Sequence, residues 1–499
     1  MSSLRQKTVS GVFWTGLAKT SMQVMLLIVM FILARLLSEA DFGIVAMAGI
    51  ITIALGMVNE QGLGTAIIQK KSITNSQIVS VFWGSIAFGL LLFVLGVVAA
   101  FPVSRFYNEQ LIRPVIIVLS GGFLIGAFGI VQKALLTKEM AFKKLAIIEM
   151  AGVTVSGIAA IIMALLKCGV WSLVMMALLR DLVTVILLWF YHQWRPTRHF
   201  SWREFKELLS FSANVLGNDI ALYLVANADI TIIGKMLGKV MLGYYSLAMN
   251  LVKIPVTRLT AIVGKVVYPA FSELQDNVQS FKNSYLRSIT FISLITFPLL
   301  AGLCVFSHEF ILVFLGEKWL PMSLPLILLA PMAMLKSVGS IRGSVFMACG
   351  KPQIGFIWNM LFLIPLIAGV IFGVRYGLNG AAAAYSIVYV ITYPLIQHIT
   401  NRLIDTTMVE FLHAMSISAY ASVLMVFAGL AVKLVFAGWL SNGNLLVLLI
   451  GVLISILVYY LSIRILKKSL LDEFVNLLKS IKSKKSEVNL NISEAPAQL

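Results

Sequence analysis

The chain has 499 residues, of which 60% are hydrophobic and only 12% are charged, and its formal net charge is +18. A soluble domain carries about 25% charged residues, so this composition excludes an ordinary soluble protein and favours a membrane protein. The three cysteines are scattered and the five histidines lack ligand spacing, so no disulfide framework, metal site or cofactor is expected. The basic balance suits a membrane topology rather than nucleic acid.

The first apolar run follows Arg5 and Lys7 and continues to Leu37, which is too long for a cleaved signal peptide. Apolar runs of about 18 residues or more predict membrane helices, because backbone polar groups must be satisfied internally within lipid. Fourteen spans are expected, at about 11–35, 42–66, 78–102, 112–133, 145–167, 171–191, 208–233, 242–268, 284–305, 321–345, 354–374, 379–401, 411–437 and 444–466. The predicted fold class is therefore all-α integral membrane.

Lysine and arginine in the connecting segments predict the orientation. If the N-terminus is cytoplasmic, the inner segments and tail hold 23 basic residues and the outer segments hold 9. Cytoplasmic segments carry the excess of positive charge in membrane proteins. Both termini are therefore expected in the cytoplasm, as an even number of spans requires.

A basic segment with two tryptophans, 192–205, divides the chain after six spans. We expect an N-terminal six-helix lobe with this cytoplasmic linker over 1–207, and a C-terminal six-helix lobe over 208–405. An extra helix pair over 406–466 and a cytoplasmic tail over 467–499 complete the predicted organisation.

An internal repeat supports this division into two lobes. The stretch Ala34–Ser38 followed by Phe42-Gly43 has the same pattern of residue types as Gly234–Gly238 followed by Leu242-Gly243. Each copy links the first and second span of a six-span group. Two halves in the same orientation are typical of transporters with parallel repeats, in which rocking of the halves exposes a shared cleft to each side in turn. Chance similarity of two amphipathic turns is the alternative.

Charges inside the spans give the candidate site. The basic residues placed there are Lys19, Arg180, Lys253, Arg258, Lys265, Lys336 and Arg342, and the acidic ones are Glu60, Glu149, Asp181, Asp219 and Asp229. Each charge at the bilayer centre costs about 2.5–3.5 kcal/mol, so most of them should face water or a partner. The excess of cations predicts an anionic substrate, because guanidinium and ammonium groups suit phosphate oxygens.

Each of these charges also has a structural interpretation. Lys265 and Arg342 can snorkel to the inner interface, and Lys19 can pair with Glu60. Lys253, Arg258 and Lys336 lie deeper and have no evident partner in their own spans.

The carboxylates within the spans also have both a functional and a structural interpretation. Glu60, Asp181 and Asp219 can carry protons or a coupling cation, and a plain ion pair with a basic residue is the alternative for each of them.

Motifs for chemistry are missing. The chain contains no P-loop pattern, no His-Glu-x-x-His and no nucleophile elbow, so neither ATP hydrolysis nor another catalytic activity is expected.

Several short motifs resemble those of bacterial polysaccharide flippases of the Wzx type, in particular the colanic acid or lipopolysaccharide exporter subgroup. They are Ser3–Thr8 with Gly11 and Trp14, Leu33–Leu37 with Phe42-Gly43, Gln69–Lys71, Gly316–Trp319, and Leu335–Gly339 with Gly343-Ser344. The resemblance covers about residues 3–400 and rests on the order and spacing of these motifs.

The resemblance implies membership of the multidrug/oligosaccharidyl-lipid/polysaccharide exporter superfamily, with two six-helix lobes and two extra helices. It implies transfer of a polyprenyl-diphosphate-linked oligosaccharide across the bilayer, driven by an H⁺ or Na⁺ gradient, with polysaccharide polymerase and assembly proteins as further partners. Central basic residues would hold the diphosphate. The residues predicted to bind substrate are Lys19, Arg180, Lys253, Arg258, Lys336 and Arg342, and those predicted to couple ions are Glu60, Asp181 and Asp219.

Three other functions are considered. A multidrug cation antiporter of the same superfamily would have an acidic or aromatic cavity. A membrane glycosyltransferase or polymer ligase would need carboxylates or a large outer loop. A scaffold for a polysaccharide assembly complex would not explain unpaired charge inside the spans.

Overall fold

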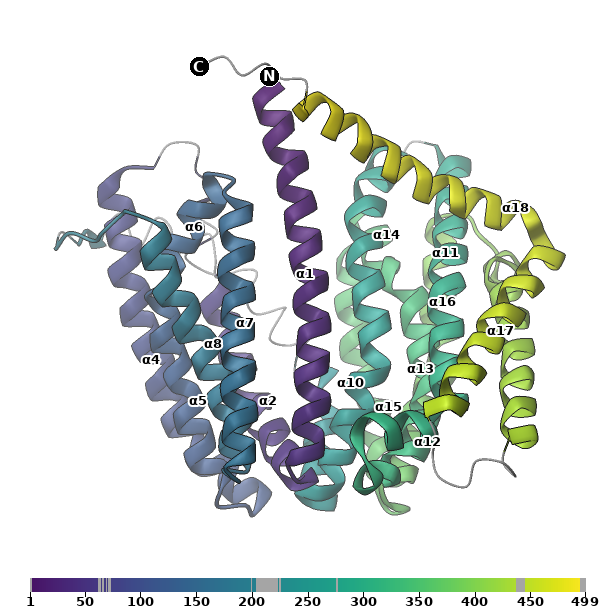
Figure 1. Ribbon diagram of the computed structural model, residues 1–499, viewed down its shortest axis with the longest axis horizontal. Coiled ribbons are helices and arrows are strands. Elements are labelled where there is room, and N and C mark those ends of the chain that lie inside the picture. Colours follow the sequence, from purple (N-terminus) through teal and green to yellow (C-terminus); the bar gives the residue numbers. More distant parts are fainter. Residues whose placement is uncertain are drawn as a thin grey trace. The chain divides into compact units, whose positions relative to one another are not determined.

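The computed structural model describes residues 2–61, 64, 67–68, 70, 73–198, 200–202, 223, 226–274, 277–436 and 445–493. Their regular structure is helical (Figure 1). Eleven helices among them are long and apolar enough to cross a membrane, and the bent pair α5–α6 adds a twelfth candidate. The expected all-α membrane fold is confirmed. Of the two remaining expected spans, 208–233 lies largely outside the described residues and 242–268 falls within α10.

The chain forms two compact units, Met1–Gly243 and Tyr244–Leu499. The boundary lies within α10 (Ala228–Glu273), which changes direction at Gly238, where φ is 79° and ψ is −177°. A positive φ of this kind is tolerated by glycine because it has no Cβ. The first turns of α10 therefore belong to unit 1 and the rest to unit 2.

Unit 1 contains α1 (Ser2–Leu36), α2 (Glu39–Gln61), α4 (Asn75–Tyr107), α5 (Ile112–Ala127), α6 (Ile130–Lys138), α7 (Phe142–Leu165) and α8 (Val170–Tyr191). The main packed pairs are α4 with α5, α7 with α8, and α1 with α7 (Figure 1). Many side chains on the outside of this bundle are large and apolar, as expected for helices that face lipid: Leu165 is 63% exposed and Phe190 is 80% exposed.

The span expected at 112–133 is not one straight helix. It consists of α5 and α6, which are bent by 45° at the break between them. At Gly129 a Cβ would lie 2.9 Å from Val185 and 3.1 Å from Leu188, so a glycine is needed for α8 to approach the bend. Small residues commonly allow helices to pack closely in membranes.

Unit 2 continues from α10 with α11 (Val278–Val305), α12 (Ser307–Phe310), η1 (Ile311–Leu315), η2 (Glu317–Met322), α13 (Ser323–Val338), η3 (Gly339–Ile341) and α14 (Arg342–Ala348). It ends with α15 (Gln353–Val374), α16 (Gly377–Leu403), α17 (Met408–Phe436) and α18 (Leu445–Ser493). The α18 helix breaks at Lys467, where φ is −161° and ψ is 80°, and this is the residue at which the tail was expected to begin.

Short hydroxyl side chains join the central helices of unit 2. The Ser293 hydroxyl donates to that of Ser418 at 3.0 Å, which links α11 to α17. Thr296 and Ser337 share a 2.8 Å hydrogen bond that links α11 to α13. All four residues are buried, so these bonds satisfy polar groups that lipid and apolar side chains would leave unpaired.

The two copies of the internal repeat meet in unit 1. A Cβ added to Gly43 would overlap the carbonyl oxygen of Lys239, and one added to Gly243 would overlap the carbonyl oxygen of Glu39. The α2 helix and the start of α10 therefore touch backbone to backbone, and corresponding residues of the two copies take the same places in the contact. This reciprocity explains why both copies of the repeat end in glycine.

We expect Gly43→Leu or Gly243→Leu to force this contact apart and to lower the free energy of unfolding by at least about 1–3 kcal/mol, the usual cost of overpacking. Thermal unfolding of the detergent-solubilised protein measures the effect. Gly121→Ala is the control, because no atom lies within 4 Å of the Cβ position there. Equal stability of the leucine variants and the control would contradict the described contact.

Candidate functional site

Two of the predicted substrate-binding cations lie on long helices of unit 1. Lys19 is on α1 and Arg180 is on α8, and both side chains are exposed. Among the described residues, neither forms an ion pair with a carboxylate. The expected partner of Lys19 was Glu60, whose side chain lies outside the described residues. Arg180 and its neighbour Asp181 form no ion pair with each other, as expected for adjacent positions on a helix.

The position of Arg180 depends on a close approach of α7 and α8. A Cβ at Gly152 of α7 would lie 2.6 Å from the Thr184 hydroxyl oxygen and 3.3 Å from the Arg180 carbonyl oxygen. Glycine at this position lets the two backbones come together, and the stem of Arg180 lies against the same place on α7.

Asp181 lines a cavity inside unit 1. The cavity has a volume of about 410 Å³, and its polar lining includes Thr52, Lys133, Asp181 and Thr184. A Cβ at Gly122 would lie 3.3 Å from a carboxylate oxygen of Asp181, so this glycine gives the carboxylate room. Lys133 pairs with Glu149 at 3.5 Å. The ion-coupling role of Asp181 stays a prediction, and the cavity gives it a polar setting.

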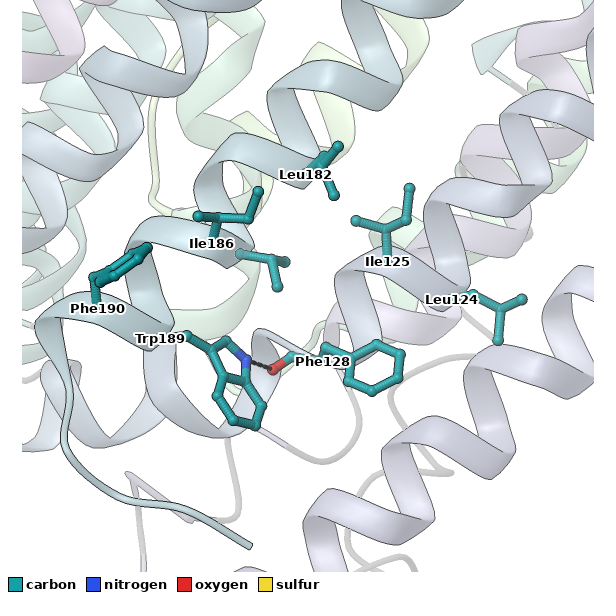
Figure 2. Close-up of a pocket in the computed structure, with 8 residues that line it drawn as sticks. Leu124, Ile125, Phe128, Leu182, Ile186, Trp189 and Phe190 are labelled. Atoms are coloured by element: carbon teal, nitrogen blue, oxygen red, sulfur yellow. Dashed lines mark hydrogen bonds between the residues drawn. The ribbon is translucent and has the colours of Figure 1, made fainter.

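A second hollow of unit 1 is entirely apolar. It measures about 490 Å³ and is lined by eight residues of α5, α8 and the turn after α5, among them Leu124, Leu182, Trp189 and Phe190 (Figure 2). The Trp189 indole N–H donates to the Phe128 carbonyl oxygen at 2.9 Å, so the indole N–H beside the hollow already has its hydrogen-bond partner (Figure 2). This surface suits hydrocarbon chains and has no group that could bind phosphate.

Unit 2 carries the remaining described cations. Lys253 on α10 is half-buried and forms no ion pair among the described residues. Lys336 is half-buried on α13 and does have interaction partners. Arg342 begins α14. The Arg258 side chain and the whole of Asp219 lie outside the described residues, so their predicted roles stay predictions.

The cations toward the ends of the spans are different, because carboxylates neutralise several of them. Lys239 pairs with Glu109 at 2.7 Å, Lys282 with Glu410 at 2.7 Å, and Lys433 with Glu309 at 2.9 Å. Lys19, Arg180, Lys253 and Arg342 therefore stand out as span cations that the described carboxylates do not neutralise. An uncompensated charge in a membrane helix needs water or an anion beside it.

Unit 2 also contains a polar cluster that was not predicted from the sequence. Gln397 and Asn401 of α16 are buried, and the Gln397 side-chain amide donates to the Tyr285 hydroxyl at 2.9 Å and to the side-chain oxygen Oδ1 of Asn401 at 2.7 Å. Their spacing of four residues places them on one face of α16. Two amide side chains four residues apart in an apolar span are the sequence feature from which this cluster could have been predicted.

Comparison with known proteins gives a consistent result. A family model described as "Polysaccharide biosynthesis protein" matches residues 32–324. The lipopolysaccharide biosynthesis protein WzxC of Escherichia coli is 28% identical over 377 residues, which cover 74% of this chain and 76% of WzxC. The succinoglycan biosynthesis transport protein ExoT of Rhizobium meliloti is 25% identical over 485 residues, which cover 96% of this chain and 97% of ExoT.

The fold is also found among solved structures. The lipid II flippase MurJ in an inward closed conformation aligns with a TM-score of 0.72, covering 92% of this chain and 99% of MurJ at 17% identity. At this identity the alignment shows a shared fold.

The span cations should border water. In a background without the three native cysteines, we expect Arg180→Cys and Lys253→Cys to react with a charged, membrane-impermeant thiosulfonate at least roughly tenfold faster than Phe190→Cys, because thiolate formation needs water. Labelling rates in inside-out and right-side-out vesicles measure this. Phe190 is the control, since it is the exposed edge of the apolar hollow. Equal rates at all three positions would mean that the cations do not face an aqueous space.

Proposed function

Because the chain belongs to the polysaccharide biosynthesis protein family, we propose that it flips polyprenyl-diphosphate-linked oligosaccharide repeat units from the inner to the outer leaflet of the bacterial cytoplasmic membrane. The names of WzxC and ExoT connect relatives of this chain with lipopolysaccharide biosynthesis and succinoglycan transport. The observation that carries the proposal is that three span cations, Lys19, Arg180 and Lys253, have no carboxylate partner among the described residues.

A diphosphate is the anion that best suits these groups. It spreads negative charge over several oxygens, which ammonium groups can approach from any side and which a guanidinium can bind in a fork. The oligosaccharide is neutral or acidic and hydrophilic, so it requires an aqueous path, whereas the polyprenyl tail is soluble in the bilayer. In this proposal the cations hold the diphosphate while the tail stays in lipid, and alternating access of the protein moves the head group across.

The proposal includes the topology and the energy source. Both termini lie in the cytoplasm, as the distribution of basic residues predicts, and an H⁺ or Na⁺ gradient drives the cycle. Asp181 is the coupling residue for which the described structure offers a polar cavity. Arg258, Lys336, Glu60 and Asp219 complete the proposed substrate and coupling sets. Polysaccharide polymerase and assembly proteins would receive the flipped product.

Removing a span cation should stop flipping without preventing insertion. We expect Arg180→Gln or Lys253→Gln to slow transfer of a labelled polyprenyl-diphosphate oligosaccharide in proteoliposomes by roughly 10- to 100-fold. This corresponds to the loss of one hydrogen bond to a charged group, which is worth about 1.5–3 kcal/mol. The matched control is Arg287→Gln, which removes an exposed guanidinium that is already paired with Glu473. Wild-type rates in both test variants would reject the proposed site.

Coupling can be tested separately at Asp181. We expect Asp181→Asn to abolish the acceleration of flipping by an imposed H⁺ or Na⁺ gradient, because the amide neither takes up a proton nor attracts a cation. The initial flipping rate with and without a gradient measures this. Thr184→Val, which changes another polar residue of the same cavity but keeps the carboxylate, is the control. An unchanged gradient response in Asp181→Asn would remove this residue from the coupling mechanism.

A further inference from the structure

Arg342 in unit 2 is half-buried and, within the described part of the chain, lacks the carboxylate partner that such a group normally has. The Arg342 Cζ lies 4.7 Å from the centre of the Tyr393 ring, and its Nε donates to the Gly339 carbonyl oxygen at 3.0 Å. The Nη1 of Arg342 is buried and has no hydrogen-bond partner. Among the described residues, Arg342 forms no ion pair with a carboxylate.

The surroundings of Arg342 contain further unsatisfied atoms. Three side-chain atoms are also buried without hydrogen-bond partners: the Tyr393 hydroxyl oxygen, the Gln397 Oε1 and the Asn401 Nδ2. These residues are 0–5% exposed, and all three lie on one stretch of α16. Buried polar atoms are almost always paired, so the orphan Nη1 of Arg342 and the orphan hydroxyl of the adjacent Tyr393 point to an occupant that lies against them.

The chemistry of these atoms favours a small anion at Arg342. The guanidinium Nη1 can only donate and carries positive charge, and the Tyr393 hydroxyl can donate beside it. Among the described residues, Lys282 of α11 already pairs with Glu410 of α17, so this carboxylate is not a spare partner for Arg342. Water could satisfy the Gln397 oxygen, but it would leave the charge of Arg342 uncompensated.

The size of the occupant is limited by packing. Tyr285, Val338, Ile341, Val345 and Tyr393 belong to one buried core cluster, so a diphosphate or a sugar would not fit within it. A cavity of about 400 Å³ adjoins this cluster and is lined by Phe281, Ala348 and Leu403 among others. Phe281 precedes Tyr285 by one helical turn, and Leu403 follows Asn401 by two residues. The cavity therefore borders the core cluster that contains Tyr285 and Tyr393.

We propose that Arg342, with Tyr393 beside it, binds a small monovalent inorganic anion such as chloride inside unit 2. The anion neutralises the guanidinium and fixes α14 against α16. This role differs from the substrate binding expected for Arg342 from the sequence, and it goes beyond the flipping function proposed above.

Two neighbouring glycines allow a test in which none of the proposed ligand side chains is replaced. A Cβ at Gly339 would lie 2.6 Å from Nη2 and 2.9 Å from Cζ of Arg342, so Gly339→Ala must displace the guanidinium. At Gly343 nothing lies within 4 Å of the Cβ position, so Gly343→Ala should leave the site intact. Both changes add one methyl group, and they lie within four residues of each other.

The experiment uses the full-length protein in nanodiscs with chloride as the probe. Binding of radioactive chloride is measured directly, and the unfolding temperature is compared in sodium chloride and sodium gluconate at constant ionic strength. We expect one saturable chloride per chain and a rise of roughly 3 °C for each tenfold step above the Kd. Gly343→Ala should behave as the wild type, whereas Gly339→Ala and Arg342→Gln should bind at least roughly tenfold more weakly.

Tyr393→Phe keeps the ring and removes only the hydroxyl, so it tests the site even if the other variants fold poorly. We expect it to weaken chloride binding several-fold. Arg180→Gln should impair flipping but bind chloride normally. This variant therefore separates a failure of the proposed chloride site from a failure of the proposed flipping function. The proposal is overturned if the wild type binds no saturable chloride, or if Gly339→Ala, Arg342→Gln and Tyr393→Phe all bind it as tightly as the wild type.

Discussion

Hydrocarbon offers no hydrogen-bond partner and no screening, and this constraint governs the whole molecule. It makes every described regular element helical, because only a helix satisfies its own backbone within one segment. It places hydroxyl pairs such as Ser293 with Ser418 between helices rather than toward lipid. It also gives every charge within a span a significance that a surface charge in water does not have. Glu410 neutralises Lys282, whereas no described carboxylate neutralises Arg180 or Lys253.

The fold could be predicted from the sequence because hydropathy reports directly on transfer into lipid. Every expected span that falls within described residues corresponds to a helix or to a bent or broken helical segment. The bend between α5 and α6 could not be foreseen, since it depends on how closely Val185 and Leu188 approach Gly129. The reciprocal packing of Gly43 and Gly243 also could not be predicted from the sequence. The repeat was visible in the sequence, but a repeat alone does not say that its two copies touch.

The candidate site was only partly accessible from the sequence. Charges within spans can be listed by position, and Lys19, Arg180 and Lys253 were identified in this way. Which of them has a partner depends on rotation about the helix axis and on side chains far away in the chain. Arg342 illustrates this limit: its neighbour Tyr393 is about fifty residues further along the chain, and only the packing of α14 near α16 brings the two together.

The glycine contact between α2 and the start of α10 has a mechanical consequence. Two backbones that touch without intervening side chains can rotate about the point of contact, but a shift along either axis brings a Cβ of a neighbouring residue against the opposing carbonyl group. Such a crossing acts as a pivot that resists sliding. Movement of these helices during a working cycle would then be confined to tilting about one fixed point, and its axis would be set by the chain itself rather than by the surrounding lipid.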